Sequence, residues 1–170
     1  DNRDAELCSL FNVVLQNLQR AQEVELINSA LVCLKSFLHK LKVSPEYTSQ
    51  GIPAGLPASL AAACPVLERY CTALAHDESS IGLLCDAFVE IATIAEVSSL
   101  SDSVSQLLQR MFYERKYVKC FEALGALGVA GISYDVGLII RFMETALSVM
   151  SSPELVEGHP DLLESLWTSL

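Results

Sequence analysis

Apolar residues recur along this chain at the spacing of one face of an α-helix. In three stretches the pattern is centred on an alanine, with apolar residues three positions before it and one, four and seven positions after it. These alanines are Ala30, Ala87 and Ala123. Each stretch follows another helical segment after a short polar break. The pattern therefore predicts recurring helical hairpins, as in a stacked α-solenoid.

The same periodicity predicts eight helical segments and no strand. They span approximately residues 4–19, 23–41, 57–75, 80–97, 99–113, 116–130, 134–150 and 159–170. Pairing them in chain order gives about four antiparallel helix pairs. The predicted fold class is all-α, an α-α superhelix of the HEAT-like solenoid type. We expect one such helical-repeat segment over residues 1–170.

Local signals predict where the helices begin and break. Asp4 is expected to be the N-cap of the first segment, and Ser99 or Ser101 that of the fifth. Residues 42–56 contain two prolines and two glycines, and are predicted to form the longest loop. Pro65 predicts a kinked but continuous third helix.

Three glycines lie in the sixth predicted segment. They lower helix propensity but allow a neighbouring helix to approach closely, and the last of them suits a C-terminal cap. They are Gly125, Gly128 and Gly131. Their G-x-x-G-x-x-G spacing resembles a phosphate-binding loop, but no strand precedes it, so we do not expect a phosphate site.

Composition narrows the class of partner. The net charge is −10, which argues against direct nucleic-acid binding and fits a protein with basic partners or a simple excess of solvated acids. No apolar run approaches the roughly 20 residues of a membrane span, and no signal peptide opens the chain. The chain lacks an initiator Met and ends in an amphipathic segment with Trp167, so we expect a piece of a longer protein.

The sequence offers no set of residues for catalysis, a metal or a cofactor. The six cysteines form no C-x-x-C pair, and we expect reduced thiols, as in cytosolic or nuclear proteins, rather than disulfides. The three histidines have no partner at a ligand spacing. An all-α enzyme or small-ligand bundle would need a deep pocket with converging polar groups. We therefore expect no enzyme.

One row of polar residues follows from the alanine register. Residues directly before the alanines, or before Ser165 in the equivalent place of the last helix, share one helix edge. Second helices of solenoid hairpins line the concave side, so carboxylates there would suit a basic ligand segment. The alternatives are solvated acids, or acids paired with Lys and Arg of the adjacent repeat. The predicted protein-binding acids are Asp86, Glu122 and Glu164, together with Glu90 one turn beyond Asp86 on a neighbouring edge, and Ser29 has the equivalent place in the first repeat.

A basic cluster lies between the fifth and sixth segments. It is either a solvated turn or a contact for an acidic partner or phosphate. The cluster consists of Arg110, Arg115, Lys116 and Lys119, with Tyr113 and Tyr117 as packing residues.

The order of residues resembles the HEAT repeats of karyopherin-β proteins, the nuclear import and export receptors. Residues 81–92 and 104–112 are similar to a second helix and the following first helix of those receptors, and residues 157–167, Glu-Gly-His-Pro-Asp-Leu-Leu-Glu-Ser-Leu-Trp, to a segment of the transportin-SR branch. The resemblance implies cargo binding on a concave surface, regulation of the whole receptor by the GTPase Ran, nucleoporin contacts, and a cytoplasmic and nuclear location. The alternative is a HEAT or MIF4G-like scaffold module of another large RNA-processing or trafficking assembly.

Overall fold

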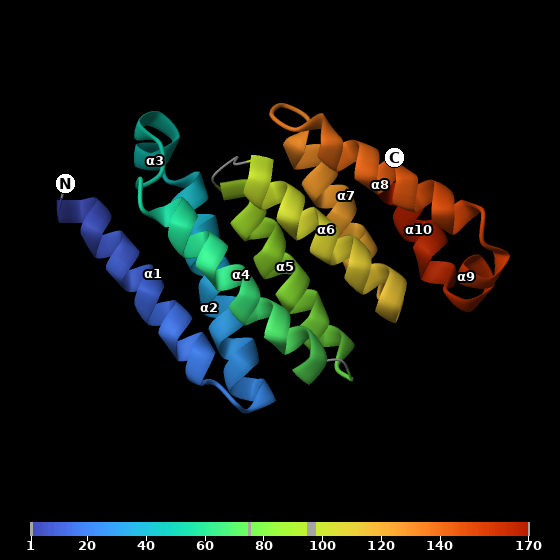
Figure 1. Ribbon diagram of the computed structural model, residues 1–170, viewed down its shortest axis with the longest axis horizontal. Helices are drawn as coiled ribbons and strands as arrows, with labels where there is room; N and C mark the ends of the chain where they lie inside the picture. Colours follow the sequence, from blue (N-terminus) through green and yellow to red (C-terminus); the bar gives the residue numbers. More distant parts are fainter. Residues whose placement is uncertain (1, 75, 95–97, 170) are drawn as a thin grey trace. The chain divides into compact units, whose positions relative to one another are not determined.

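A computed structural model describes residues 2–74, 76–94 and 98–169, and all regular secondary structure in these ranges is α-helical (Figure 1). The predicted all-α class is confirmed. In chain order the helices are α1 (Asn2–Arg20), α2 (Val24–Val43), α3 (Pro45–Gln50), α4 (Leu56–Ala73), α5 (Glu78–Ile94), α6 (Ser98–Arg115), α7 (Val118–Gly131), α8 (Val136–Met150), α9 (Pro153–Gly158) and α10 (Pro160–Ser169).

The chain divides into two compact units, Asp1–Ala95 and Glu96–Leu170. In unit 1, α1 and α2 form one helical hairpin, and α4 and α5 form the next. The first helices α1 and α4 pack against each other, as do the second helices α2 and α5. Unit 1 therefore consists of two stacked hairpins, which is the predicted arrangement of neighbouring solenoid repeats.

Unit 2 follows a related plan: α6 and α7 form a hairpin, α8 packs on both of them, and α10 packs on α7. The short α9 connects α8 to α10 and packs on both. Three buried rings, those of Phe112, Phe121 and Phe142, run through α6, α7 and α8 with centroids 5.6 and 5.1 Å apart. They form an aromatic core for this unit.

The alanine register describes the buried faces of the second helices. Positions three before and one and four after the alanine are buried in α2, α5 and α7. The alanine itself is buried at Ala87 and Ala123 but only half-buried at Ala30. At the seventh position after it, Ile94 is buried whereas Ala130 is exposed. The register therefore identifies the core side correctly and loses accuracy toward the helix ends.

The prediction of a long loop over residues 42–56 is wrong. Helix α2 continues to Val43, and Pro45 opens the separate helix α3, since a proline at the first turn lacks only an N–H that would have no helical partner. Gly51 then ends α3 at φ 81°, a conformation that favours glycine. Within this stretch only Ser44 and residues 51–55 remain non-helical. Helix α4 runs uninterrupted through Pro65, as predicted.

The predicted N-caps are also wrong. Asp4 lies inside the first turn of α1. Ser101 is a buried residue of α6, and its hydroxyl lies 3.0 Å from the hydroxyl of Tyr134. Asp77 instead caps α5, accepting hydrogen bonds from the backbone N–H groups of Ser79 and Ser80. The predicted segment ends at residues 75, 97 and 170 lie outside the described residues.

The glycines of α7 permit close helix packing, as predicted. A Cβ at Gly128 would lie 3.2 Å from the Cα of Ile139 in α8, and one at Gly131 would collide with the side chain of Leu138. The cap prediction fails, however, because Gly131 is the last residue of α7 and Ile132 follows in the right-handed helical region.

Candidate protein-binding surface

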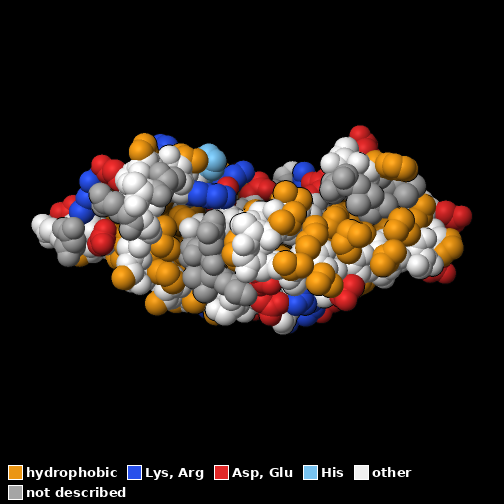
Figure 2. Space-filling view, turned by 90° about the horizontal axis from the view of Figure 1, so that it is seen from above, with side chains coloured by type: hydrophobic (Ala, Val, Ile, Leu, Met, Phe, Trp, Pro, Cys, Tyr) orange, Lys and Arg blue, Asp and Glu red, His pale blue; other side chains and the backbone are white. Residues whose placement is uncertain are grey.

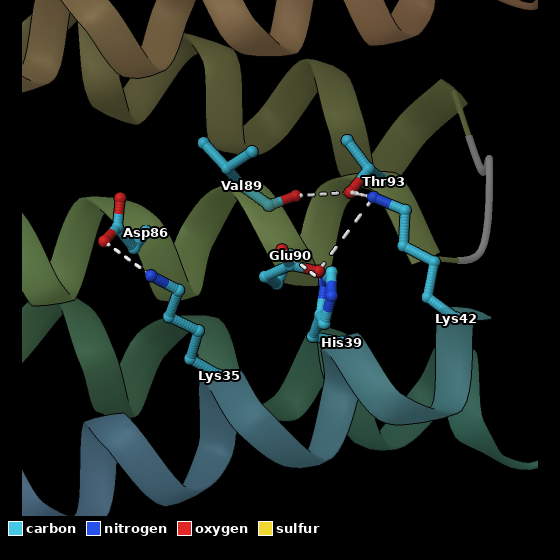
Figure 3. A network of polar contacts seen from close by, with 7 residues as sticks. All are labelled: Lys35, His39, Lys42, Asp86, Val89, Glu90 and Thr93. Atoms are coloured by element: carbon cyan, nitrogen blue, oxygen red, sulfur yellow. Dashed lines mark hydrogen bonds and ion pairs between the residues drawn. The ribbon is translucent and has the colours of Figure 1, made fainter. Parts of the chain in front are cut away.

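A seam of polar side chains joins α2 to α5 (Figure 3). The Lys35 ammonium lies 2.9 Å from the Asp86 carboxylate. Two turns farther along, the Lys42 ammonium donates a 3.0 Å hydrogen bond to the Thr93 hydroxyl. That hydroxyl in turn donates to the carbonyl of Val89 at 2.8 Å. The side chains that point toward one another along this seam are Lys35, His39 and Lys42 of α2 and Asp86, Glu90 and Thr93 of α5.

Glu90 occupies the middle of this seam and is its least exposed charged residue. One carboxylate oxygen lies 3.6 Å from Nδ1 of His39, and the other lies 3.9 Å from Nζ of Lys42. Its side chain is 15% exposed, against 52% for that of Asp86. An ion pair at Glu90 is therefore less screened by water than the pair at Asp86.

The seam exists because the two helices run in the same direction with matched spacing. Cations or a histidine recur on α2 at intervals of four and three residues, and their partners recur on α5 at the same intervals. Every one of the pairs 35–86, 39–90 and 42–93 is separated by 51 residues. Residues four and three apart share a helix face, so one face of α2 meets one face of α5.

The predicted binding acids of unit 1 are thus partly engaged within the protein. Asp86 and Glu90 form ion pairs with the adjacent repeat, which is one of the alternatives that the sequence left open. Asp86 and Lys35 nonetheless remain about half exposed, so a ligand can still reach both. Their role in binding a partner stays a prediction.

In unit 2 the predicted acids have a different environment. Glu122 of α7 accepts a 3.0 Å hydrogen bond from the hydroxyl of Ser165 in α10, and its second oxygen lies 3.2 Å from Lys119. Ser165 is buried, as expected of a residue in the alanine place. Glu164, next to it, is exposed. In unit 1, Ser29 is exposed and donates only to the carbonyl of Glu25 in its own helix.

The basic cluster around the turn between α6 and α7 makes contacts within the protein. The Lys116 ammonium lies 5.6 Å above the ring of Tyr113, a cation–π distance. Lys116 itself has φ 59°, so the chain turns sharply there. Arg110 and Arg115 are exposed.

The Cys64 thiol is too weakly acidic to act as a nucleophile at neutral pH. Burial raises the pKa of the Cys64 thiol to about 11, with the Glu68 carboxylate adding to the shift, so this thiol is protonated at neutral pH. A groove of about 440 Å³ between α1 and α2 is lined mainly by small and apolar side chains, Cys33 among them, together with Asn17 and Arg20. Across the described ranges, no group of three or more His, Cys, Asp or Glu residues is arranged to hold a metal ion.

Reasoning from the sequence missed half of the seam. The spacing of Lys35, His39 and Lys42 is a helix-face pattern and is visible in the sequence. Their partners are more than 50 residues away, and only the packing of α2 on α5 identifies them.

None of the helices in the described residues is both long and apolar enough to cross a membrane. Comparison with family models, curated proteins and solved structures finds no match to this chain.

Proposed function

We propose that this chain is a protein–protein interaction scaffold, and specifically the cargo-binding part of a nuclear transport receptor that acts in the cytoplasm and nucleus. The observation that carries the proposal is the stacking of successive helices in each unit: α1 packs on α4 and α2 on α5 in unit 1, and α6 packs on α8 and α7 on α10 in unit 2. Stacked hairpins expose rows of helix faces, and such rows commonly bind other proteins. The resemblance to karyopherin-β HEAT repeats supplies the specific role.

The acids of the second helices are the proposed contacts for a basic segment of the partner. Glu164 is exposed, and Glu122 shares its carboxylate between Ser165 and Lys119. Asp86 and Glu90 can bind a cation only by exchanging or sharing the ammonium groups of α2. We therefore propose that Glu122 and Glu164 contribute more to binding than Asp86 and Glu90.

Neutral substitutions test these contacts. The variants Glu122→Gln with Glu164→Gln, and Asp86→Asn with Glu90→Gln, remove charge and keep side-chain shape. The matched control is Glu6→Gln with Glu25→Gln, which removes two acids of α1 and α2 outside the proposed set. Binding of a labelled lysine-rich peptide is measured by fluorescence anisotropy at low and high salt. We expect the unit 2 pair to weaken binding by about tenfold and the control pair to leave it unchanged. An equal loss of affinity in all three variants would mean that peptide binding depends only on the net charge of the protein.

Dependence on Ran tests the transport role. The longer protein containing this chain is used to capture partners from lysate with and without Ran locked in its GTP state. Release or recruitment of a partner by Ran supports the receptor role. A stoichiometric complex that ignores Ran would instead support the HEAT or MIF4G-like scaffold of another assembly.

A further inference from the structure

Helix α8 carries a continuous apolar stripe on its exposed side. The five side chains are between 45% and 60% exposed, although all are large and hydrophobic. Figure 2 looks onto the side of the molecule where α8 lies, and hydrophobic side chains gather over this helix. The stripe consists of Val136, Ile140, Met143, Leu147 and Met150.

The opposite side of α8 is already committed to the core of unit 2. Its buried residues face α6 and α7, and they are Leu138, Phe142, Thr145, Ala146 and Val149. A helix that is apolar on both sides is normally buried on both. A scattered exposed apolar residue is ordinary, but five in one line along a helix of 15 residues mark an interaction surface.

The spacing within the stripe indicates the shape of the partner. Successive members are four, three, four and three residues apart, which is the heptad spacing at which two helices pack side by side. Helix α8 is about 22 Å long at 1.5 Å per residue, which corresponds to two heptads. A partner helix with apolar residues at the same spacing would cover the stripe along its whole length.

Charge around the stripe selects among such helices. Asp135 precedes Val136, and Glu144 lies one turn from Ile140 and from Leu147, directly beside the stripe. Residues 136–161 contain four acids but only one arginine and no lysine. That arginine, Arg141, is held by Asp102 of α6 at 2.6 Å. The border of the stripe is therefore acidic.

We propose that the exposed face of α8 is a docking site for an amphipathic partner helix with heptad-spaced apolar residues and basic flanks. Lysine or arginine beside the partner's apolar stripe would meet Glu144 and the neighbouring acids. A second copy of this chain is the less suitable occupant, because α8 against α8 would bring acid against acid. The site uses none of the four acids of the proposed cargo contact, so it does not rest on that proposal.

Designed peptides test the site on the whole chain. The first probe is a three-heptad helix with leucine at both core positions and lysine at the flanking positions. The second probe has glutamate in place of the lysines, and the third is the lysine peptide with its residues scrambled. The α8 variant is Ile140→Ser with Leu147→Ser. The control variant is Leu10→Ser with Val13→Ser, which removes two equally exposed apolar side chains from α1. Circular dichroism confirms that each variant remains helical.

We expect the parent protein to bind the lysine heptad peptide at least about tenfold more tightly than either other peptide. The α8 variant should lose about tenfold in affinity, whereas the control variant and the Glu122→Gln, Glu164→Gln variant should bind as the parent does. If the lysine and glutamate peptides bind equally tightly, the proposed preference for a partner helix with basic flanks is wrong. If the α8 variant binds the lysine peptide as tightly as the parent does, the proposed location of the site on α8 is wrong. A dimer in sedimentation that the α8 variant abolishes would assign the face to a second copy.

Discussion

Gly131 shows how a single missing methyl group sets the distance between two helices. An added Cβ would lie 3.2 Å from Cγ of Leu138 and closer still to one of its methyl groups. Leu138 is 1% exposed, so its side chain has no free volume into which it can rotate. The close approach of α7 to α8 therefore depends on glycine at this position.

We predict that Gly131→Ala lowers the free energy of unfolding by about 1–2 kcal/mol, because overpacking exceeds the gain in helix propensity. Urea denaturation followed by circular dichroism measures the change. Gly158→Ala is the control, since an added Cβ there meets no atom within 4 Å, and it should be neutral or slightly stabilising. A stabilised Gly131→Ala protein would show that α7 and α8 can move apart freely.

The carboxylate of Asp77 caps the N-terminus of α5, and its hydrogen bonds there change its pKa. The Ser80 hydroxyl, followed by backbone N–H groups of Ser80 and Ser79, holds the pKa of the Asp77 carboxyl below its ordinary value of 3.8. The charged form is therefore favoured in the folded state. Its stabilising contribution is complete above the unfolded pKa, and it is lost as the pH falls through the lower folded pKa.

We predict that Asp77→Asn, which keeps a capping oxygen but cannot titrate, unfolds at a lower temperature than the parent at pH 6. The difference should shrink steadily as the pH falls from 5 to 2, because the parent loses its carboxylate over that range. Thermal unfolding across the pH series provides the measurement. A constant difference at every pH would exclude a role for the charge.

At the scale of whole elements, the sequence predicted helix type well and helix junctions poorly. The buried faces of α2, α5 and α7 follow from apolar spacing alone, because the 3.6-residue period leaves one side for the core. The junction at residues 42–56 was predicted wrongly because proline and glycine act by position. Pro45 interrupts a helix in its middle but starts one at its first turn.

The candidate site was predictable on one helix only. Asp86 was found because it directly precedes the register alanine of α5, and Glu90 because it lies one turn beyond Asp86. Their partners on α2 depend on which face of α2 meets α5 and in which direction, and this is decided by tertiary packing. The sequence therefore identified the acids of α5, but it did not show that ammonium groups of α2 already pair with them.

The seam between α2 and α5 allows two ion pairs of different burial to be compared. We predict that the double-mutant cycle of Lys35→Met and Asp86→Asn gives a coupling below about 1 kcal/mol, because both groups are about half exposed. That coupling should fall further as salt rises. The cycle of Lys42→Met and Glu90→Gln should depend less on salt, because Glu90 is mostly shielded from water. Denaturation at low and high salt measures both, and identical salt dependence would contradict the assigned difference in burial.

At the scale of the whole molecule, the division into two units separates two cores. Leu34 is fully buried in unit 1, and Phe121 lies at the centre of the aromatic core of unit 2. Each large-to-small substitution should cost about 2–5 kcal/mol.

We predict that Leu34→Ala raises amide hydrogen exchange in α1, α2, α4 and α5, and that Phe121→Ala raises it in α6, α7 and α8, each with little effect in the other unit. Mass spectrometry of peptides from each unit measures the exchange. Faster exchange throughout the chain from either substitution would mean that the two units unfold as one.

The constant offset between α2 and α5 has a geometric consequence. The two hairpins of unit 1 are related by a translation, since α2 and α5 run in the same direction with a constant offset in sequence. Two copies related by a two-fold axis would instead pair one face with the same face of the other copy. When hairpins stack by such a translation, each added hairpin covers the exposed face of the previous one and exposes an equivalent face of its own. The number of hairpins in such a stack is therefore set by how many the gene encodes, since the packing geometry imposes no limit of its own.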